Sequence, residues 1–263
     1  MIFPVRESER KVFPKFRFLG IELGAVSSAE AVEFPLDGGL VLAPSGPGLC
    51  TLEWDCHYRE ALENADLNLP DSGLAIFLMK GLGLGKLPRT SGLGFLMALL
   101  ERPELRLPGA TVWAMPSPES MRRNLGFLQT AGVPVREEDC YLAPIYPAAG
   151  EVCDPALLEK IRSGNAQFVF VCTGSGSQEK LGLWLKRNLP APITICCIGA
   201  AIGFLSGDQV RIPAWADRVC LGWLFRCLSS PRKFVPRYVA AIRLIWLAIR
   251  YRDKPPPIRG SKS

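Results

Sequence analysis

Short apolar runs alternate along most of this chain with segments whose apolar residues recur at helical spacing. Uninterrupted apolar runs are typical of strands buried on both faces, and the segments between them have the period of helices packed on a sheet. The predicted strands are 18–23, 39–43, 66–69, 110–115, 141–146, 168–172 and 193–198, and the predicted helices are 52–65, 74–80, 92–100, from 118, 155–163 and 181–188. We therefore expect an α/β fold, with a Rossmann-like, mainly parallel sheet and helices on both faces.

The alternation ends near residue 207, where the character of the sequence changes. This change predicts a Rossmann-like core over 1–207 and a basic, helical C-terminal appendage over 208–263. Residues 1–16 are polar and irregular, which predicts a loose arm or a short edge element, and 199–204 has the composition of a glycine-bearing turn. The proline-rich end predicts disorder after about residue 253.

Segment 234–251 of the appendage has apolar residues at helical spacing, with arginines and Trp246 among them. This pattern is typical of a basic amphipathic helix that lies on an anionic membrane surface. A terminal helix docked on the core with a charged outer face is the alternative. The charge balance favours the membrane, because Asp253 is the one acid among many cations from Arg226 onward.

The composition is that of a folded protein, because 48% of the 263 residues are hydrophobic and 21% are charged. The nine cysteines form no Cys-x-x-Cys pair and are accompanied by one histidine, which predicts reduced thiols and no zinc site. No secretory signal is visible, and the apolar runs 193–205 and 239–249 are too short to span a bilayer. These features predict a cytoplasmic protein that touches a membrane without crossing it.

One junction between a strand and a helix has the pattern of a binding loop. The apolar run that begins at Phe168 breaks off at Thr173, and Gly174-Ser175-Gly176 leads into a helix start near Ser177. Ligands bind at the carboxyl ends of strands in open α/β sheets, and amides at a helix N-terminus are donors for an anion such as a diphosphate. A phosphate-bearing ligand and a plain glycine-rich connection both remain open from this segment alone.

Two charged residues follow strands or lie in loops where they could act on a ligand. Asp71 comes between a short strand and a helix, so its carboxylate could accept a proton from an attacking hydroxyl. The alternative is an N-cap aspartate that accepts helix amides. Arg89 precedes a helix start and could bind a phosphate, although an isolated arginine is more often a solvated charge.

Gly81-Leu82-Gly83-Leu84-Gly85 has the glycine spacing of a dinucleotide fingerprint. The fingerprint needs a strand before it and a helix after it, whereas this segment follows a predicted helix. We therefore predict a helix C-terminus and a loop. A nucleotide-dependent oxidoreductase is disfavoured for this reason, and because no acidic residue is placed for a ribose.

Several motifs occur in an order and spacing that together are specific. They are Glu60-Ala61-Leu62 to Ala65-Asp66-Leu67, Pro70-Asp71, Arg89, Gly174 to Lys180, Gly199 to Gly207, Arg211 to Trp215, Leu221 to Arg226, Pro231 to Lys233, and Arg237-Tyr238. With this series, residues 38–240 resemble the WecG/TagA/CpsF glycosyltransferases, also called glycosyltransferase family 26.

The resemblance implies transfer of a sugar, of the N-acetylmannosamine type, from a UDP-sugar to an undecaprenyl-diphosphate-linked acceptor. Such a reaction builds a surface polysaccharide or cell-wall polymer at the inner face of the cell membrane. The implied fold is the Rossmann-like GT-E fold, with a C-terminal appendage that covers the site and aids membrane association. No metal or other cofactor and no nucleic acid are implied, and self-association is left open.

The resemblance also implies roles for individual residues. Asp71 would be the general base that deprotonates the acceptor hydroxyl, with inversion at the donor anomeric carbon. The residues implied to bind the nucleotide-sugar are Ser45, Gly174, Ser175, Gly176, Gln178, Glu179 and Gly199. The cations implied to meet diphosphate charge are Arg89, Arg211, Arg226, Lys233 and Arg237.

The chain also departs from the family pattern. The departures are Ala43 and Ser45 for a threonine and an asparagine, Ser72 for a glycine, Gly176 and Ser177 for a proline and a lysine, and Gly203 and Gly222 for two acids. Because Asp71, Arg89 and Gln178 match, we expect an active enzyme with an altered donor or acceptor preference. The alternative is a catalytically weak or inactive, membrane-docked partner of a polysaccharide assembly complex.

Overall fold

The computed structural model describes residues 13–34, 38–190, 192–210, 216 and 222–259. These residues form a six-stranded sheet in the order β4-β3-β8-β7-β5-β6, and every pair in it is parallel. The strands are β3 (Gly39–Leu42), β4 (Leu67–Asn68), β5 (Thr111–Met115), β6 (Cys140–Leu142), β7 (Phe168–Val171) and β8 (Thr194–Cys197). The predicted α/β fold is therefore confirmed.

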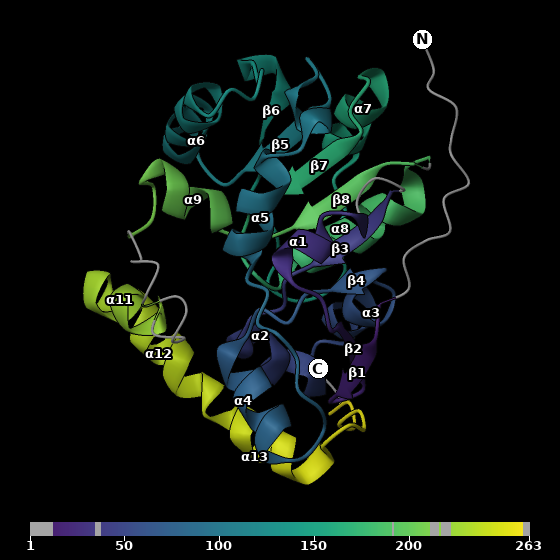
Figure 1. The fold of residues 1–263 in the computed structure, drawn as a ribbon, viewed down its shortest axis with the longest axis vertical. Coiled ribbons are helices and arrows are strands. Elements are labelled where there is room, and N and C mark those ends of the chain that lie inside the picture. Colours follow the sequence, from purple (N-terminus) through teal and green to yellow (C-terminus); the bar gives the residue numbers. More distant parts are fainter. Residues whose placement is uncertain (1–12, 35–37, 191, 211–215, 217–221, 260–263) are drawn as a thin grey trace.

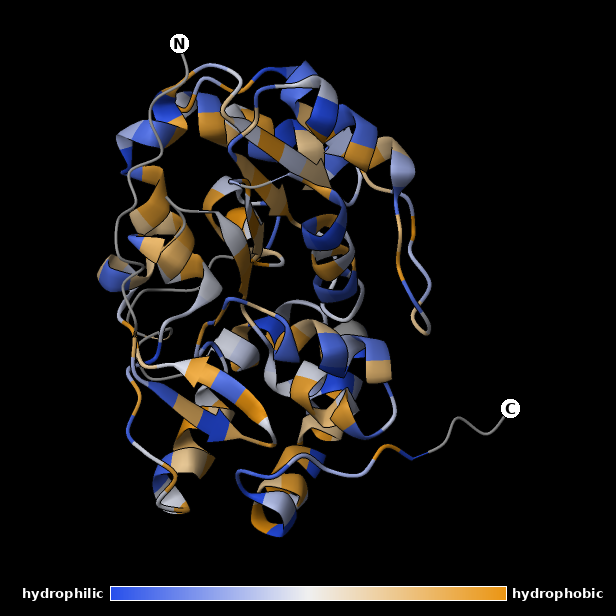
Figure 2. Ribbon diagram, turned by 90° about the vertical axis from the view of Figure 1, so that its right-hand side faces the viewer, coloured by the Kyte–Doolittle hydropathy of each residue, from blue (hydrophilic) through white to orange (hydrophobic). Residues whose placement is uncertain are grey.

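Helices cover both faces of this sheet (Figure 1). On one face lie α3 (Cys56–Glu63), α7 (Pro155–Ser163) and α8 (Ser177–Asn188), and on the other lie α1 (Ser28–Ala31), α5 (Gly92–Leu100), α6 (Pro118–Thr130) and α9 (Ala201–Ser206). Short helical turns occur at α2 (Gly46–Leu49), η2 (Cys50–Glu53), η3 (Pro103–Arg106) and η4 (Glu137–Asp139). Figure 2 shows the central strands as largely hydrophobic and the surrounding helices as mixed.

The continuous apolar runs follow from this two-sided cover. Along β7, Val169 and Val171 face the layer of α3, α7 and α8, while Phe168 and Phe170 face the layer of α5 and α6. Because both sets of side chains are buried, the strand shows no polar alternation. The ring of Phe170 stacks on Trp113 of the neighbouring strand with centroids 3.9 Å apart.

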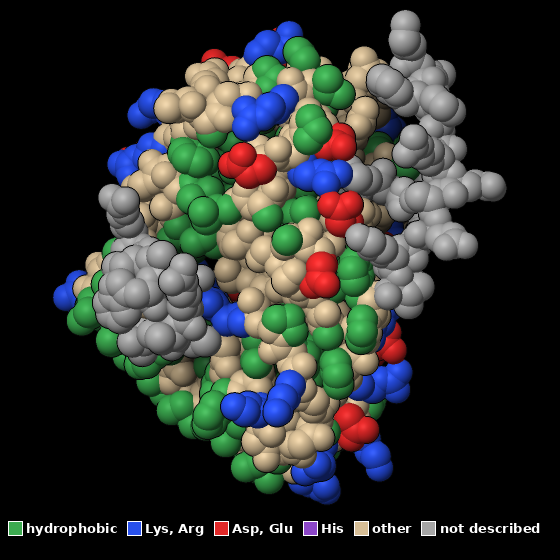
Figure 3. All heavy atoms as spheres, viewed as in Figure 1, with side chains coloured by type: hydrophobic (Ala, Val, Ile, Leu, Met, Phe, Trp, Pro, Cys, Tyr) green, Lys and Arg blue, Asp and Glu red, His purple; other side chains and the backbone are tan. Residues whose placement is uncertain are grey.

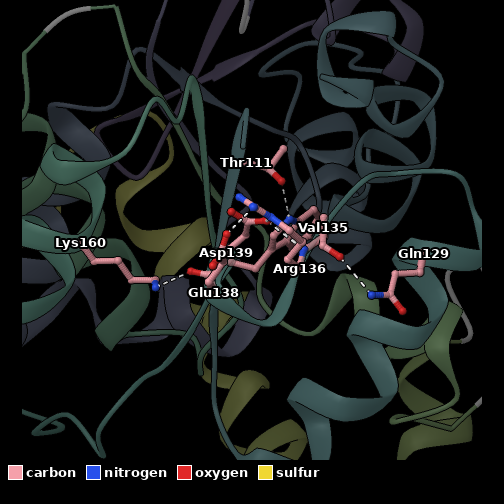
Figure 4. Close-up of polar contacts among 8 residues, drawn as sticks. Thr111, Gln129, Val135, Arg136, Glu138, Asp139 and Lys160 are labelled. Atoms are coloured by element: carbon pink, nitrogen blue, oxygen red, sulfur yellow. Dashed lines mark hydrogen bonds and ion pairs between the residues drawn. The ribbon is translucent and has the colours of Figure 1, made fainter. Parts of the chain in front are cut away.

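The edge strand β6 is held by polar contacts at its amino end (Figure 4). The Asp139 carboxylate accepts the backbone amide proton of Arg136 at 2.8 Å. Lys160 of α7 donates to the Glu138 carbonyl at 2.5 Å. These bonds lie at the end of the sheet opposite to the carboxyl ends of the strands.

Several local predictions differ from the structure, and the strand predicted for 141–146 is limited to β6. Residues 18–23 are not one strand but the antiparallel hairpin of β1 (Lys15–Phe18) and β2 (Ile21–Gly24), because Leu19 and Gly20 both have positive φ and form a tight turn. Segment 199–204 is a turn at Gly199 and Ala200 only, and α9 begins at Ala201. Most of the arm predicted for 1–16 lies outside the described residues.

The C-terminal part is helical, with α11 (Gly222–Ser229), α12 (Pro231–Ala241) and α13 (Arg243–Tyr251). The single helix predicted for 234–251 is thus two helices that meet at Ile242. Figure 1 shows α11 to α13 as a band along one side of the molecule, and α13 packs against α2 and α4 (Gly73–Gly81). Leu244, Leu247 and Ala248 of α13 are fully buried in the same hydrophobic cluster as the sheet.

The segment after α13, for which the composition predicts disorder, contacts the first hairpin and α3. The amide of Gly20 donates to the Asp253 carbonyl at 3.0 Å. Arg59 of α3 is buried and donates to the Pro256 carbonyl at 2.5 Å. A Cβ at Gly20 would lie 2.7 Å from the Pro255 Cβ, so glycine is required for this close approach.

Candidate active site

A cavity of about 660 Å³ lies between the carboxyl ends of β3, β4 and β8 and the C-terminal helices. Its sheet side is lined by residues that follow these strands, and its other side by α9, α11, α12 and α13. Of the residues predicted for the site, those that line the cavity are Ser45, Asp71, Arg89 and Arg226. The fold thus brings together four positions that are far apart in the sequence.

Asp71 lies in the loop between β4 and α4. Its Oδ1 atom accepts the backbone amide proton of Gly92, the first residue of α5, at 3.1 Å. The N-cap of α4 is Ser72, whose side chain accepts the Ala75 amide, so Asp71 is not the cap of the helix that follows it. The carboxylate is therefore fixed at the cavity by a helix from a distant part of the chain.

Arg89 is tied to the same loop. Its Nε atom donates to the backbone carbonyl of Asp71 at 3.1 Å, and the Thr90 amide donates to the Pro70 carbonyl at 3.2 Å. Ser91 then caps α5 by accepting the Gly94 amide. These bonds join segments 70–72 and 89–92 into one wall that carries a carboxylate and a guanidinium.

Ser45 connects three parts of the site. It caps α2 by accepting the Gly48 amide at 3.2 Å, and its hydroxyl lies 3.2 Å from the Ser175 hydroxyl. Arg237 of α12 donates to the same Ser45 Oγ at 3.4 Å. Ser45 thus links the cavity to the loop after β7 and to the C-terminal helices.

The glycine-serine loop, residues 174–176, contacts Ser45 through the Ser175 hydroxyl but does not line the cavity. Gly176 has a φ of 103° at the N-cap of α8, a conformation that favours glycine. The helix begins at Ser177, directly after the loop as expected, and therefore earlier than the predicted range 181–188. Glu179 is fully buried in the first turn of α8. Burial raises the pKa of the Glu179 carboxyl, and hydrogen bonds from Gln178 and Gly176 act in the opposite direction.

Gln178 is also buried, and its side-chain amide faces the turn at Gly199. A Cβ at Gly199 would lie 3.6 Å from both the nitrogen and the oxygen of this amide. Gly199 has a φ of 61°, so glycine allows this turn to follow β8 without strain. The loops after β7 and β8 are thereby placed side by side.

The cationic residues of the C-terminal part are only partly described. Arg226 lies with its guanidinium 4.7 Å from the centroid of the Phe204 ring and donates to the Tyr238 hydroxyl at 3.4 Å. Arg211 and the side chain of Lys233 lie outside the described residues. The aromatic contacts hold the Arg226 charge at the cavity wall.

The apolar wall of the cavity was not predicted as part of the site. Val235, Val239, Ile242 and Ile245 line it from α12 and α13. The signal was present, because 235, 239 and 242 share one helical stripe, but that stripe was assigned to a membrane surface. The side chains of this stripe therefore line the cavity and are also exposed to solvent.

Arg243 was predicted to be one of the cations of the membrane segment but instead contacts the core. It forms an ion pair with Glu53 of η2, which is fully buried and also pairs with Arg259 at 3.2 Å. The guanidinium of Arg243 also lies over the rings of Trp54 and Trp246. This pair fastens α13, and with it the apolar wall, to the body of the protein.

Within the described residues there is no group of three or more His, Cys, Asp or Glu side chains arranged to hold a metal ion. Among the helices described, none is both long and apolar enough to cross a bilayer.

Comparison with known proteins gives the family. The sequence model of the glycosyl transferase WecG/TagA/CpsF family matches residues 16–256. An N-acetylglucosaminyldiphosphoundecaprenol N-acetyl-beta-D-mannosaminyltransferase of Bacillus spizizenii is 24% identical over 196 residues, which are 70% of this chain and 71% of that protein. A protein of the same name from Bacillus subtilis is 29% identical over 99 residues, 35% of this chain and 38% of its own length. The chain therefore belongs to the WecG/TagA/CpsF family and is a glycosyltransferase.

Proposed function

We propose that this protein transfers a sugar, of the N-acetylmannosamine type, from a UDP-sugar to a sugar linked to undecaprenyl diphosphate. The names of the Bacillus relatives support the acceptor and the type of sugar, because they describe N-acetylmannosaminyl transfer to N-acetylglucosaminyldiphosphoundecaprenol. The UDP carrier of the sugar is what the family resemblance implies. The observation that carries the proposal is the position of Asp71, whose carboxylate lines a cavity between the strand ends and an apolar wall. In this proposal the product is part of a surface polysaccharide or cell-wall polymer.

Asp71 is the proposed general base. A carboxylate offers about four acceptor positions, so the bond from the Gly92 amide can orient it while it still accepts a proton. Deprotonation of an acceptor hydroxyl would let that oxygen attack the anomeric carbon from the side opposite to UDP. The anomeric configuration would then be inverted.

Protein cations are proposed to balance the charge of the leaving UDP. Arg89 and Arg226 line the cavity from opposite sides, and Arg237 reaches Ser45 at its edge. Fixed donors aimed at a developing charge stabilise the transition state more than the ground state. The family resemblance implies the same role for Arg211 and Lys233, and no metal has a role in this proposal.

The nucleotide-sugar is proposed to bind beside Ser45, against the loops at 174–176 and Gly199, with Gln178 in contact with it. The Ser45 hydroxyl already joins the cavity to the Ser175 hydroxyl, which supports continuity between the two places. Backbone amides at the start of α8 would add donors for an anion.

The apolar wall suits a lipid-linked acceptor. Val235, Val239, Ile242 and Ile245 surround the cavity from α12 and α13, and Trp246 and Ile249 of α13 are exposed. Figure 3 shows hydrophobic side chains gathered along the lower left edge, where Figure 1 places α12 and α13. We propose that the appendage predicted for 208–263 closes the cavity and rests on the inner face of the cell membrane.

The activity is tested with purified protein, a panel of UDP-sugars and an N-acetylglucosaminyl-diphosphoundecaprenol acceptor, with mass spectrometry of the lipid product. We expect one added N-acetylhexosamine, from UDP-N-acetylmannosamine. Absence of any product while vesicle binding persists would reject the enzyme reaction and favour the non-catalytic partner. The altered position that favours this second candidate is Gly222, which lines the cavity where the resemblance implies an acid.

Membrane binding is tested without deleting α13, because its Leu244 and Leu247 belong to the core. Replacing the exposed Trp246 and Ile249 by glutamate should weaken co-sedimentation with anionic vesicles about tenfold, since both apolar area and charge balance are lost. The control is the double replacement of Leu107 and Leu142 by glutamate, because both are exposed apolar residues in other parts of the chain. Equal loss in both proteins would reject the proposed surface.

A further inference from the structure

Glu179 is the centre of a buried hydrogen-bond cluster at the start of α8. Its Oε2 atom accepts the Gly176 amide at 2.6 Å. Its Oε1 atom accepts the Gln178 side-chain amide at 3.1 Å and the Ser175 hydroxyl at 3.4 Å. The side chain is fully buried, so it acts on a ligand only through the groups that it holds.

These bonds fix the orientation of the Gln178 amide. An ionised carboxylate only accepts hydrogen bonds, so at a pH above the raised pKa of Glu179 the amide must turn its NH₂ group toward Glu179 and its carbonyl oxygen away. That oxygen is buried and has no hydrogen-bond partner among the described residues, and Gln178 as a whole is 2% exposed. A buried acceptor without a donor is costly, which indicates that a bound group completes it.

We propose that Glu179 is a positioning residue, which holds the Gln178 amide so that its carbonyl oxygen accepts a hydrogen bond from an O–H or N–H group of the nucleotide-sugar. This inference rests on the proposed function, because that function places the nucleotide-sugar beside Gln178. It goes further in naming the chemistry of the contact: the ligand donates and the protein accepts. Glu179 itself does not touch the ligand.

Glu179→Gln is the sharpest perturbation, because it preserves size and changes only the donor pattern. The new carboxamide still accepts the Gly176 amide through its oxygen, and its NH₂ group then faces Gln178. The Gln178 amide turns over to accept from it, and so presents NH₂ where the ligand also brings a donor. Two donors that face each other cannot form the bond.

The test is a double-mutant cycle on binding measured by titration calorimetry, with UDP and with UDP-N-acetylmannosamine as probes. We expect Glu179→Gln to weaken binding about tenfold in the wild-type background. In the Gln178→Met background, where no amide remains to orient, the same substitution should change affinity less than about twofold. Equal losses in both backgrounds would show a merely structural role and overturn the inference.

The two probes show where the donor lies. If Glu179→Gln weakens the binding of both probes, the hydrogen-bond donor belongs to the nucleotide. If it weakens the binding of UDP-N-acetylmannosamine alone, the donor belongs to the sugar. If the wild type binds neither probe, the proposed function is wrong. If the wild type binds a probe but Glu179→Gln lowers the affinity equally in both backgrounds, only the positioning role is wrong.

A measurement on the wild-type protein covers the case in which Glu179→Gln does not fold. The side-chain ¹⁵N resonance of Gln178, assigned by its loss in Gln178→Met, should shift little on saturation with either probe because its NH₂ group stays on Glu179. A large shift of that nitrogen, with its protons donated to the ligand, would contradict the inference.

Discussion

Asp71 and Gly92 are joined by a hydrogen bond of 3.1 Å, from the backbone amide that opens α5 to the carboxylate that lines the cavity. A Cβ at Gly92 would lie 3.3 Å from the Ile198 carbonyl oxygen and 3.4 Å from the Ala43 Cβ, so the start of α5 is seated against the ends of β8 and β3. The position of the proposed base is therefore set by close packing of a helix on the central strands.

The packing of α8 on the sheet gives a first prediction. A Cβ at Gly182 would lie 2.5 Å from the Cys197 Sγ and 2.8 Å from the Leu40 Cδ1. Gly182→Ala should therefore lower the free energy of unfolding by about 2 kcal/mol, measured by urea denaturation. Gly126→Ala in α6 is the control, because nothing lies within 4 Å of its Cβ, and it should raise stability by up to about 1 kcal/mol. A stabilising Gly182→Ala would contradict the close packing.

The buried ion pair that fastens α13 gives a second prediction. Glu53→Gln leaves Arg243 without its charge partner and should lower the free energy of unfolding by about 2 kcal/mol. The loss is smaller than for a fully buried pair, because the Arg243 side chain is 36% exposed. Glu60→Gln, in a surface pair with Arg187, should change stability by less than about 0.5 kcal/mol. Similar small losses in both variants would show that Glu53 does not anchor the helix.

Glu179 predicts a dependence of stability on pH. Burial raises the pKa of its carboxyl, so between the unfolded value of about 4.3 and the higher folded value the native state holds more protons than the unfolded state. Its contribution to stability is then fully present below about pH 4 and is lost as the pH rises through the folded pKa. Glu179→Gln removes this loss, so its melting temperature should rise relative to wild type as the pH increases from about 4, over the pH range in which both proteins stay folded. A constant difference between the two proteins over this range would count against the raised pKa.

The helices and strands could be predicted because their signals are local. Helices α5 and α7 begin and end at the predicted residues, since Ser91 and Asp154 cap them and Pro155 opens the second. The strands follow from apolar runs buried on both faces. The first hairpin could not be predicted, because the turn contains Leu19, which rarely adopts a positive φ.

The arrangement of the site was only partly predictable. Asp71 and Arg89 were singled out by loop position, and the sheet does bring them to one cavity. The partner of Asp71 is an amide 21 residues away, and the partner of Arg243 is a carboxylate in η2. Neither has a local signature, because both depend on how helices from separate parts of the chain pack. Amphipathic periodicity likewise could not tell the cavity wall from a membrane surface.

The most direct test of the proposed reaction is the rate of sugar transfer by Asp71→Asn under saturating UDP-N-acetylmannosamine and lipid-linked acceptor. Asparagine keeps the size of the side chain and can still accept the Gly92 amide, but it cannot take a proton from the acceptor hydroxyl. We predict that kcat falls at least about hundredfold while the affinity for the UDP-sugar changes less than about threefold. Transfer by Asp71→Asn at the wild-type rate would contradict the assignment of Asp71 as the base.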